Sequence, residues 1–178
     1  MVSIVLDVTE ISAILAAAGV LVGATWYIMD MRNQAKTRQT DLVMRLYATF
    51  SSNEFQDAWT KVRKRSREFD VIDDIQEFDE KVGLREFNQV GLFFEGVGIL
   101  LKRKIVDGTM IEDLFGGAIA RAWEISKTGI IKARQQMNDP TIYYYYEYLY
   151  NEMKKREQKL QQSARKEDLT VKSSRYSR

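Results

Sequence analysis

An apolar run from Ile11 to Met29, with no charged residue in it, constrains the fold of this chain more than any other feature. Its polar side chains are Ser12, Thr25 and the ring edges of Trp26 and Tyr27. As an α-helix rising ~1.5 Å per residue, the run is about 28 Å long, close to the ~30 Å hydrocarbon core of a bilayer. The run therefore predicts a transmembrane helix.

The charges on either side of the run predict its orientation. Asp7 and Glu10 precede it without any Lys or Arg, whereas Arg32, Lys36 and Arg38 follow it directly. Because basic flanks stay on the cytoplasmic side of a membrane, we expect the N-terminus outside and residues 30 onward in the cytoplasm. This predicts a single-pass protein of the cell membrane.

The end of the run argues against its two alternatives. Trp26, Tyr27 and Arg32 suit the membrane interface, where amphipathic rings and basic groups are favoured, and we take them as interface anchors. A secretory signal peptide has a basic start and a small-residue cleavage site, and neither is present. A charge-free run of this length is also unusual for a core helix of a small soluble domain.

A stripe of small residues lies within the run. Ala16, Gly19 and Gly23 recur at helical spacing, which lets two helix backbones approach closely. These residues are candidates for packing against another membrane helix, although glycine and alanine are common in membrane helices in general.

The size of the chain leaves room for one domain after the apolar run. We expect an extracytoplasmic N-terminus at residues 1–10, the membrane helix at 11–29, a helical domain at 30–160 and a disordered tail at 161–178. The 178 residues include no cysteine and no histidine, which excludes disulfides, catalytic triads and His- or Cys-ligated metals. The net charge of +2 gives no overall attraction to nucleic acid.

The residues after the run have the pattern of an all-α fold. Pro140 is the only proline, and apolar residues recur with helical periodicity. The membrane helix is expected to continue through residues 30–50 as a stalk that becomes the first helix of a bundle. The apolar stripe of that stalk comprises Leu42, Val43, Leu46, Tyr47 and Phe50.

Two adjacent stretches carry opposite charge. A basic cluster at 61–67 is followed by an acidic stretch at 68–80 that contains apolar residues at helical spacing. We interpret them as two solvated helical segments that pair with each other. The alternatives are contact of the basic cluster with lipid headgroups and, at lower weight, calcium binding by the acidic stretch.

Two glycine-containing segments predict a close helical hairpin. Residues 87–101 contain Gly91, Gly96 and Gly98, and the helix that follows residue 107 has small residues at 116–120. Glu95 and Arg121 lie in the apolar parts of these two helices, and we expect them to form a semi-buried ion pair. The alternative is that Glu95 binds a ligand.

The last helices are predicted from an unusual tyrosine-rich segment. We expect a short helix at 129–138 and a last helix that begins at Asp139-Pro140, an acceptor followed by proline in the first turn. One face of that helix fits a core. The surplus residues Tyr144, Tyr145 and Tyr148 suit a partner surface, because their hydroxyls can stay in water.

Several of these features together resemble a known family. The chain is similar to a set of prokaryotic single-span proteins that carry a helical cytoplasmic domain of unknown function. In that set an anchor precedes an F-E-x-x-G helix, a turn, and a helix ending in tryptophan. These features fall here on Phe94, Glu95, Gly98, Asp107 and Trp123. The resemblance covers residues 10–155 and implies the architecture without an activity.

The sequence leads to one preferred functional hypothesis. We expect a membrane-anchored interaction or accessory protein whose partners are the lipid bilayer and a protein or second copy of the chain. No catalytic, cofactor or metal site is predicted, and the absence of histidine, cysteine and a phosphate-binding loop weighs against an enzyme. The alternative is a carboxylate-based sensor or enzyme centred on Glu95. Nucleic-acid binding is not expected.

Overall fold

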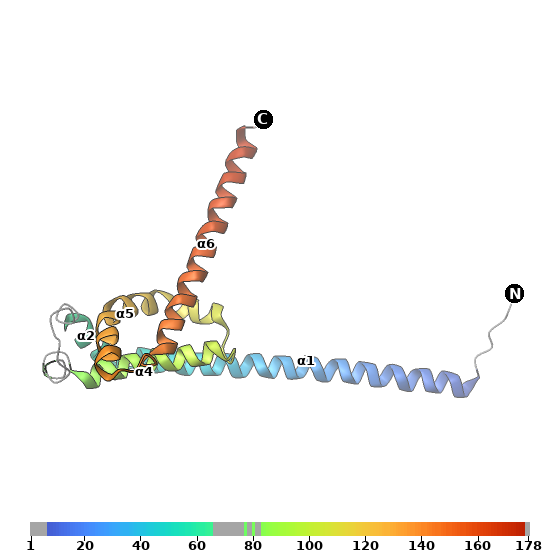
Figure 1. The fold of residues 1–178 in the computed structure, drawn as a ribbon. Helices are drawn as coiled ribbons and strands as arrows, with labels where there is room; N and C mark the ends of the chain where they lie inside the picture. The colour runs from blue at the N-terminus through green and yellow to red at the C-terminus, as the bar shows by residue number, and fades with distance from the viewer. Residues whose placement is uncertain (1–6, 66–76, 78–79, 81–82, 177–178) are drawn as a thin grey trace. The chain divides into compact units, whose positions relative to one another are not determined.

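All the regular elements that the structure describes are α-helices (Figure 1). The computed structural model describes residues 7–65, 77, 80 and 83–176. In chain order the helices are α1 (Val8–Ser51), α2 (Asn53–Arg65), α4 (Leu84–Lys102), α5 (Gly108–Met137) and α6 (Tyr144–Tyr176). The predicted all-α fold is confirmed, whereas most of the acidic stretch at 68–80 lies outside the described residues.

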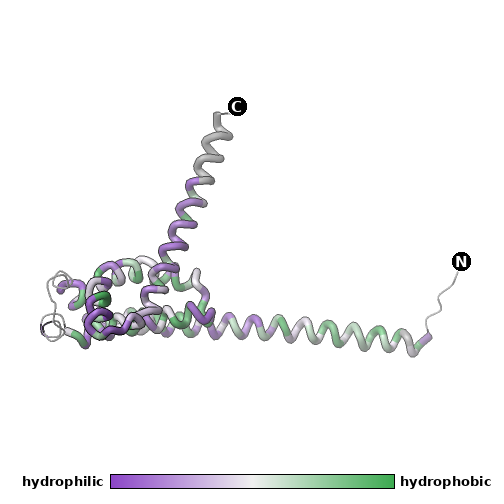
Figure 2. The backbone as a smooth tube through the Cα atoms, viewed as in Figure 1, coloured by the Kyte–Doolittle hydropathy of each residue, from purple (hydrophilic) through white to green (hydrophobic). Residues whose placement is uncertain are grey.

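The chain divides into two compact units, residues 1–41 and 42–178, and the backbone of α1 runs through the boundary. In the first unit, α1 contains a stretch long and apolar enough to cross a membrane, and none of that apolar window is buried. Hydrophobic residues dominate this half of α1 (Figure 2). In the apolar run the hydroxyls of Ser12 and Thr25 donate to carbonyl oxygens one turn earlier, those of Val8 and Leu21, each at 2.8 Å.

The second unit begins with the last turns of α1. Val43 is completely buried there, and the neighbouring apolar residues of the predicted stalk stripe pack around the same core. Phe50 contacts three other rings, those of Phe55, Phe93 and Phe115, at centroid distances of 5.2–6.0 Å. The predicted continuation of the apolar helix into the domain is therefore confirmed.

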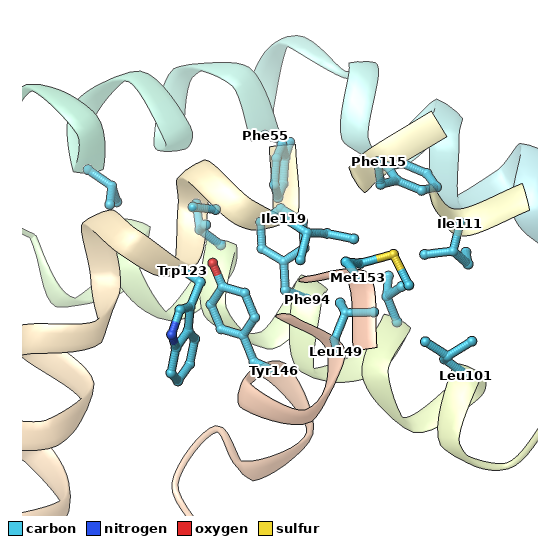
Figure 3. Packing of buried hydrophobic residues seen from close by; sticks show 14 of the residues in the cluster. Phe55, Phe94, Leu101, Ile111, Phe115, Ile119, Trp123, Tyr146, Leu149 and Met153 are labelled. Carbon is cyan, nitrogen blue, oxygen red and sulfur yellow. The ribbon is translucent and has the colours of Figure 1, made fainter. Parts of the chain in front are cut away.

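The core of the second unit is built from large side chains of all five helices named above (Figure 3). Phe94, Phe115, Ile111, Ile119 and Tyr146 are among its largest fully buried members. Burying a side chain of this size contributes about 1.5–3 kcal/mol, so this cluster is the main source of the domain's stability.

Helix α4 packs mainly against α6 and α2 and only marginally against α5. The predicted close hairpin between the two glycine-containing helices is therefore wrong. Two of the glycines of α4, Gly91 and Gly98, face the beginning of α6 instead. Among the described residues, no atom of another helix lies within 4 Å of the Cβ positions of Gly116 and Gly117 in α5.

Helix α5 is one element of 30 residues, not the two helices expected. Asp107 caps its start by accepting hydrogen bonds from the backbone N–H of Thr109 and Met110. Gly129 lies inside it and is buried, so packing compensates for the low helix propensity of glycine. The helix ends at Asn138, which adopts the left-handed conformation with φ 49°.

Helix α6 begins at Tyr144, four residues after Pro140, and continues to Tyr176. Its last buried residue is Met153, and the described side chains from 157 to 165 are exposed. A helix without tertiary packing depends on its backbone propensity alone and frays readily. Disorder of residues 161–178 in solution therefore stays a prediction, although the backbone of residues 161–176 is helical.

Candidate functional site

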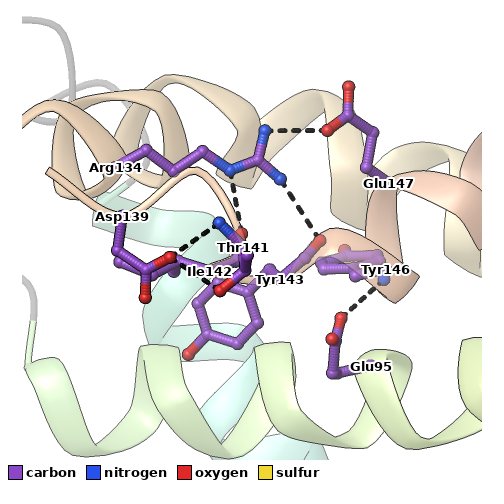
Figure 4. Close-up of polar contacts among 8 residues, drawn as sticks. All are labelled: Glu95, Arg134, Asp139, Thr141, Ile142, Tyr143, Tyr146 and Glu147. Carbon is purple, nitrogen blue, oxygen red and sulfur yellow. Dashed lines mark hydrogen bonds and ion pairs between the residues drawn. The ribbon is translucent and has the colours of Figure 1, made fainter.

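Helix α4 holds the beginning of α6 through a carboxylate. Glu95 Oε2 accepts a 2.6 Å hydrogen bond from the backbone N–H of Tyr146 (Figure 4). Tyr146 is the third residue of α6, so its N–H is one of those that a helix start leaves without an intrahelical acceptor. The negative charge also lies at the positive end of the helix dipole. Glu95 thus caps α6 from another helix.

Two glycines of α4 let the chain at the start of α6 come this close. A Cβ atom on Gly98 would lie well inside 3.0 Å of the Tyr145 carbonyl oxygen, a distance that real Cβ atoms essentially never show. A Cβ atom on Gly91 would lie 2.6 Å from the ring of Tyr143. Gly96, on the same helix, has nothing within 4 Å of its Cβ position. Only Gly91 and Gly98 are therefore required by the contact.

Tyr143 occupies a strained position just before α6. Its φ of 53° is in the left-handed region, which costs a residue other than glycine on the order of 1–3 kcal/mol. Its hydroxyl donates to Asn88 Oδ1 at 2.7 Å, and its ring lies against Gly91. Burial, followed by the negative charge of Glu95, raises the pKa of Tyr143 to about 12.

Arg134 of α5 fixes the backbone at this strained residue (Figure 4). Its Nε donates to the Ile142 carbonyl oxygen at 2.8 Å, and its Nη1 lies 2.7 Å from Glu147 Oε2. A third, longer bond of 3.4 Å reaches the Tyr143 carbonyl oxygen. Together with the Glu95 cap, these bonds hold the chain in the position from which α6 starts. We call this set of contacts the α4–α6 junction; it comprises Asn88, Gly91, Glu95, Gly98, Arg134, Tyr143, Tyr145, Tyr146 and Glu147.

Tyr146 belongs to both the junction and the hydrophobic core. Its ring stacks on Phe94 at 5.0 Å and meets Trp123 edge-on at 5.1 Å. Its hydroxyl is buried and has no hydrogen-bond partner in the described part of the chain. Burial raises the pKa of Tyr146 well above its usual value, and the buried Ser126 hydroxyl opposes this shift only in part. Burial of this unpaired hydroxyl therefore lowers the stability of the core.

The predicted ion pair between Glu95 and Arg121 is not formed. Glu95 points to the start of α6, whereas Arg121 is exposed and its Nε donates to the Gly117 carbonyl oxygen of its own helix at 3.1 Å. The reason is the packing of α4 on α6 in place of α5. The carboxylate meets a helix N-terminus, which satisfies it without a cation.

The three surplus tyrosines of α6 differ in exposure: Tyr145 and Tyr148 are partly buried, and Tyr148 packs against the core. Tyr144 is half exposed, and its ring meets that of Tyr145 edge-on at 5.2 Å. Tyr144 and Tyr148 line a shallow groove of about 490 Å³ with Lys102, whose Nζ lies 4.5 Å from the Tyr148 ring centroid. We call Tyr144, Tyr145 and Tyr148 the tyrosine surface.

A second groove, of about 600 Å³, lies between α5 and α6. Its apolar lining includes Gly116, Gly117, Ala120, Ile125 and Met153, and its rim carries Glu112, Arg121, Glu124, Lys154 and Glu157. The small residues of α5, predicted to contact α4, thus line this open α5–α6 groove.

The residues assigned to the membrane helix all lie in the first unit. Trp26 and Tyr27 are 74% and 64% exposed, and Arg32 is exposed beyond them. Gly19 and Gly23 have no atom within 4 Å of their Cβ positions, and Ala16 is exposed. Their roles as interface anchors and helix-packing residues stay predictions.

The chain matches one known protein family over most of its length. Residues 8–153 match the model of a family described as a domain of unknown function, DUF4760, and the chain belongs to this family. The search of curated proteins and the search of solved structures return no match. The resemblance to a family of unknown function is thereby confirmed, and the matched region contains both the apolar part of α1 and the α4–α6 junction.

Proposed function

We propose that the protein is a membrane-anchored helical interaction protein, acting as a component or partner of a membrane-associated assembly. One observation carries the proposal. The apolar part of α1 is exposed all along its length, and the same helix continues into a bundle with a closed core of its own.

The apolar helix is unsuited to water. Val20, Leu21 and Val22 are 68–71% exposed, and each would gain about 1.5–3 kcal/mol on leaving water. The hydroxyls of Ser12 and Thr25 are satisfied within the helix and need no water. The family match begins at residue 8, which supports a retained anchor over a removed signal segment. The flanking charges favour the N-terminus outside and the bundle in the cytoplasm.

The bundle offers two surfaces to a partner. The tyrosine surface places Tyr144 and Tyr148 along an open groove, and aromatic side chains are enriched at interfaces. The α5–α6 groove presents small residues that admit another backbone. We place the main contact on the tyrosine surface. Because the Glu95 carboxylate is engaged as a cap, no observation favours the sensor or enzyme centred on it.

Purification from membranes in mild detergent, followed by native mass spectrometry, tests this function. We expect a stoichiometric protein partner or a homo-oligomer that is lost when Tyr144 and Tyr148 are changed to alanine. Ala120→Arg, which fills the α5–α6 groove, is the matched control and should leave the complex intact. Loss only in Ala120→Arg would move the contact to that groove, and a clean monomer would contradict the interaction function.

A further inference from the structure

The end of the chain, from residue 154, has a net positive charge, whereas the residues before it are net negative. Residues 154–178 contain nine Lys or Arg and three Asp or Glu, which leaves residues 1–153 with 18 basic and 22 acidic residues. The family match ends at residue 153, where this excess begins. We call residues 154–176 the basic arm, and its backbone is helical throughout.

The described side chains of the arm are free of the core. Those from 157 to 165 are exposed, Leu160 at 63%, and the hydrogen bond that Gln161 donates to Glu157 stays within α6. Arg156 contacts α5, with its Nη1 3.8 Å from Glu112 Oε2. Figure 2 shows this part of α6 as predominantly hydrophilic. Packing against the core therefore gives no role to the exposed side chains of the arm, and its positive charge is the property from which a role can be inferred.

Four of the five described basic residues of the arm share one side of the helix, and the fifth, Arg156, lies outside it and contacts Glu112. At about 100° per residue, Lys154, Lys155, Lys159 and Arg165 fall within an arc of roughly 140° opposite Leu160. Glu157 lies outside this arc. The arrangement is that of a basic face, which fits an extended surface of negative charge better than a single small anion.

We propose that the basic arm binds the anionic headgroups of the membrane in which the chain is anchored. This inference rests on the proposed anchor. The same chain would hold the arm near the bilayer at high effective concentration, an advantage that a free nucleic acid does not have. An anionic leaflet attracts basic segments with roughly a fivefold gain in binding per Lys or Arg that reaches it.

The absence of cysteine allows a direct test on the full chain. A fluorophore on Gln162→Cys reports proximity to headgroup-labelled lipid in vesicles of phosphatidylcholine, with and without phosphatidylserine. We expect close approach only with phosphatidylserine, and loss of it near 1 M salt, where the Debye length is about 3 Å. Lys154→Gln/Lys155→Gln/Lys159→Gln should lower the bound-to-free ratio of the arm on the order of 100-fold.

A matched control removes the same charge elsewhere. Arg63→Gln/Lys64→Gln/Arg65→Gln, at the end of α2, should leave the signal unchanged. Equal effects of both triple variants, or equal signals in both lipid mixtures, would overturn the proposal. Binding of the labelled arm to duplex DNA or RNA in the presence of phosphatidylserine vesicles would also overturn the proposal. Alkaline extraction of the same vesicles tests the anchor separately, because an anchored chain stays with either lipid mixture whatever the arm does.

Discussion

Two glycines of α4 provide a matched test of the α4–α6 junction. In Gly98→Ala, the new methyl group meets the Tyr145 carbonyl oxygen, whereas in Gly96→Ala it meets nothing within 4 Å. Both positions lie inside the same helix, so both variants gain the same helix propensity, up to about 1 kcal/mol. The two variants therefore differ only in what the methyl group touches.

The geometry sets the size of the expected difference. To restore an ordinary contact, the start of α6 must move about 1 Å from α4, since the two are already close-packed. That movement lengthens the 2.6 Å bond from Tyr146 to Glu95 beyond hydrogen-bond range. A lost bond to a charged group costs about 1.5–3 kcal/mol, and overpacking costs about 1–3 kcal/mol. After a propensity gain of about 1 kcal/mol, Gly98→Ala should lose about 1.5–5 kcal/mol, whereas Gly96→Ala should gain up to about 1 kcal/mol.

Chemical and thermal unfolding of the full chain in detergent measures this difference. Trp123 contacts Tyr146 and Tyr150, so its fluorescence reports the position of α6, while circular dichroism reports total helix. Each kcal/mol should shift the melting midpoint by about 2–4 °C in a domain of this size. Equal midpoints for the two variants would refute the close approach of α4 and α6 at Gly98.

Three further predictions concern the same junction. Tyr146→Phe should leave the free energy of unfolding unchanged or raise it by up to about 1 kcal/mol, because the lost hydroxyl is unpaired. Tyr143→Phe should lower it by about 1 kcal/mol, because the lost hydroxyl donates to Asn88. Urea titrations of both variants measure the difference. Arg134→Met should lower the thermal midpoint by the equivalent of about 2 kcal/mol, whereas Lys127→Met, which removes an exposed ion pair, should change it little. Burial and the Glu95 charge raise the pKa of Tyr143 to about 12. The neutral ring therefore contributes fully to the free energy of unfolding below the unfolded pKa of about 10, and this contribution is lost as the pH rises through the folded pKa. Urea midpoints should fall between these two pH values, and they should fall less in Tyr143→Phe.

The sequence predicted the helical elements because their signals are local. Apolar periodicity placed Leu42, Val43, Leu46 and Phe50 on one stripe, and Val43 is buried while the other three pack against the core. The absence of proline and glycine between Gly23 and Asn53 predicted the continuous α1. The glycines of α4 also indicated a close approach of another backbone, which the structure has at Gly98.

The partners of these faces could not be predicted, because periodicity says which residues share a face and not which helix covers it. Glu95 and Arg121 were paired on the assumption that consecutive helices pack together, whereas Glu95 instead caps α6. The roles of Arg134 and Tyr143 were missed for a related reason. Left-handed backbone at a tyrosine has no sequence signal, and the arginine that supports it lies on a different helix.

Labelling of single cysteines in sealed membrane vesicles tests the anchor most directly. Thr9 and Thr37 are exposed threonines on either side of the apolar run, so Thr9→Cys and Thr37→Cys form a matched pair in a chain without other cysteines. With vesicles whose outer face is the cell exterior, an impermeant maleimide should modify Thr9→Cys at once and Thr37→Cys only after permeabilisation. Immediate modification of both positions, with release of the protein by alkaline carbonate, would contradict the membrane anchor.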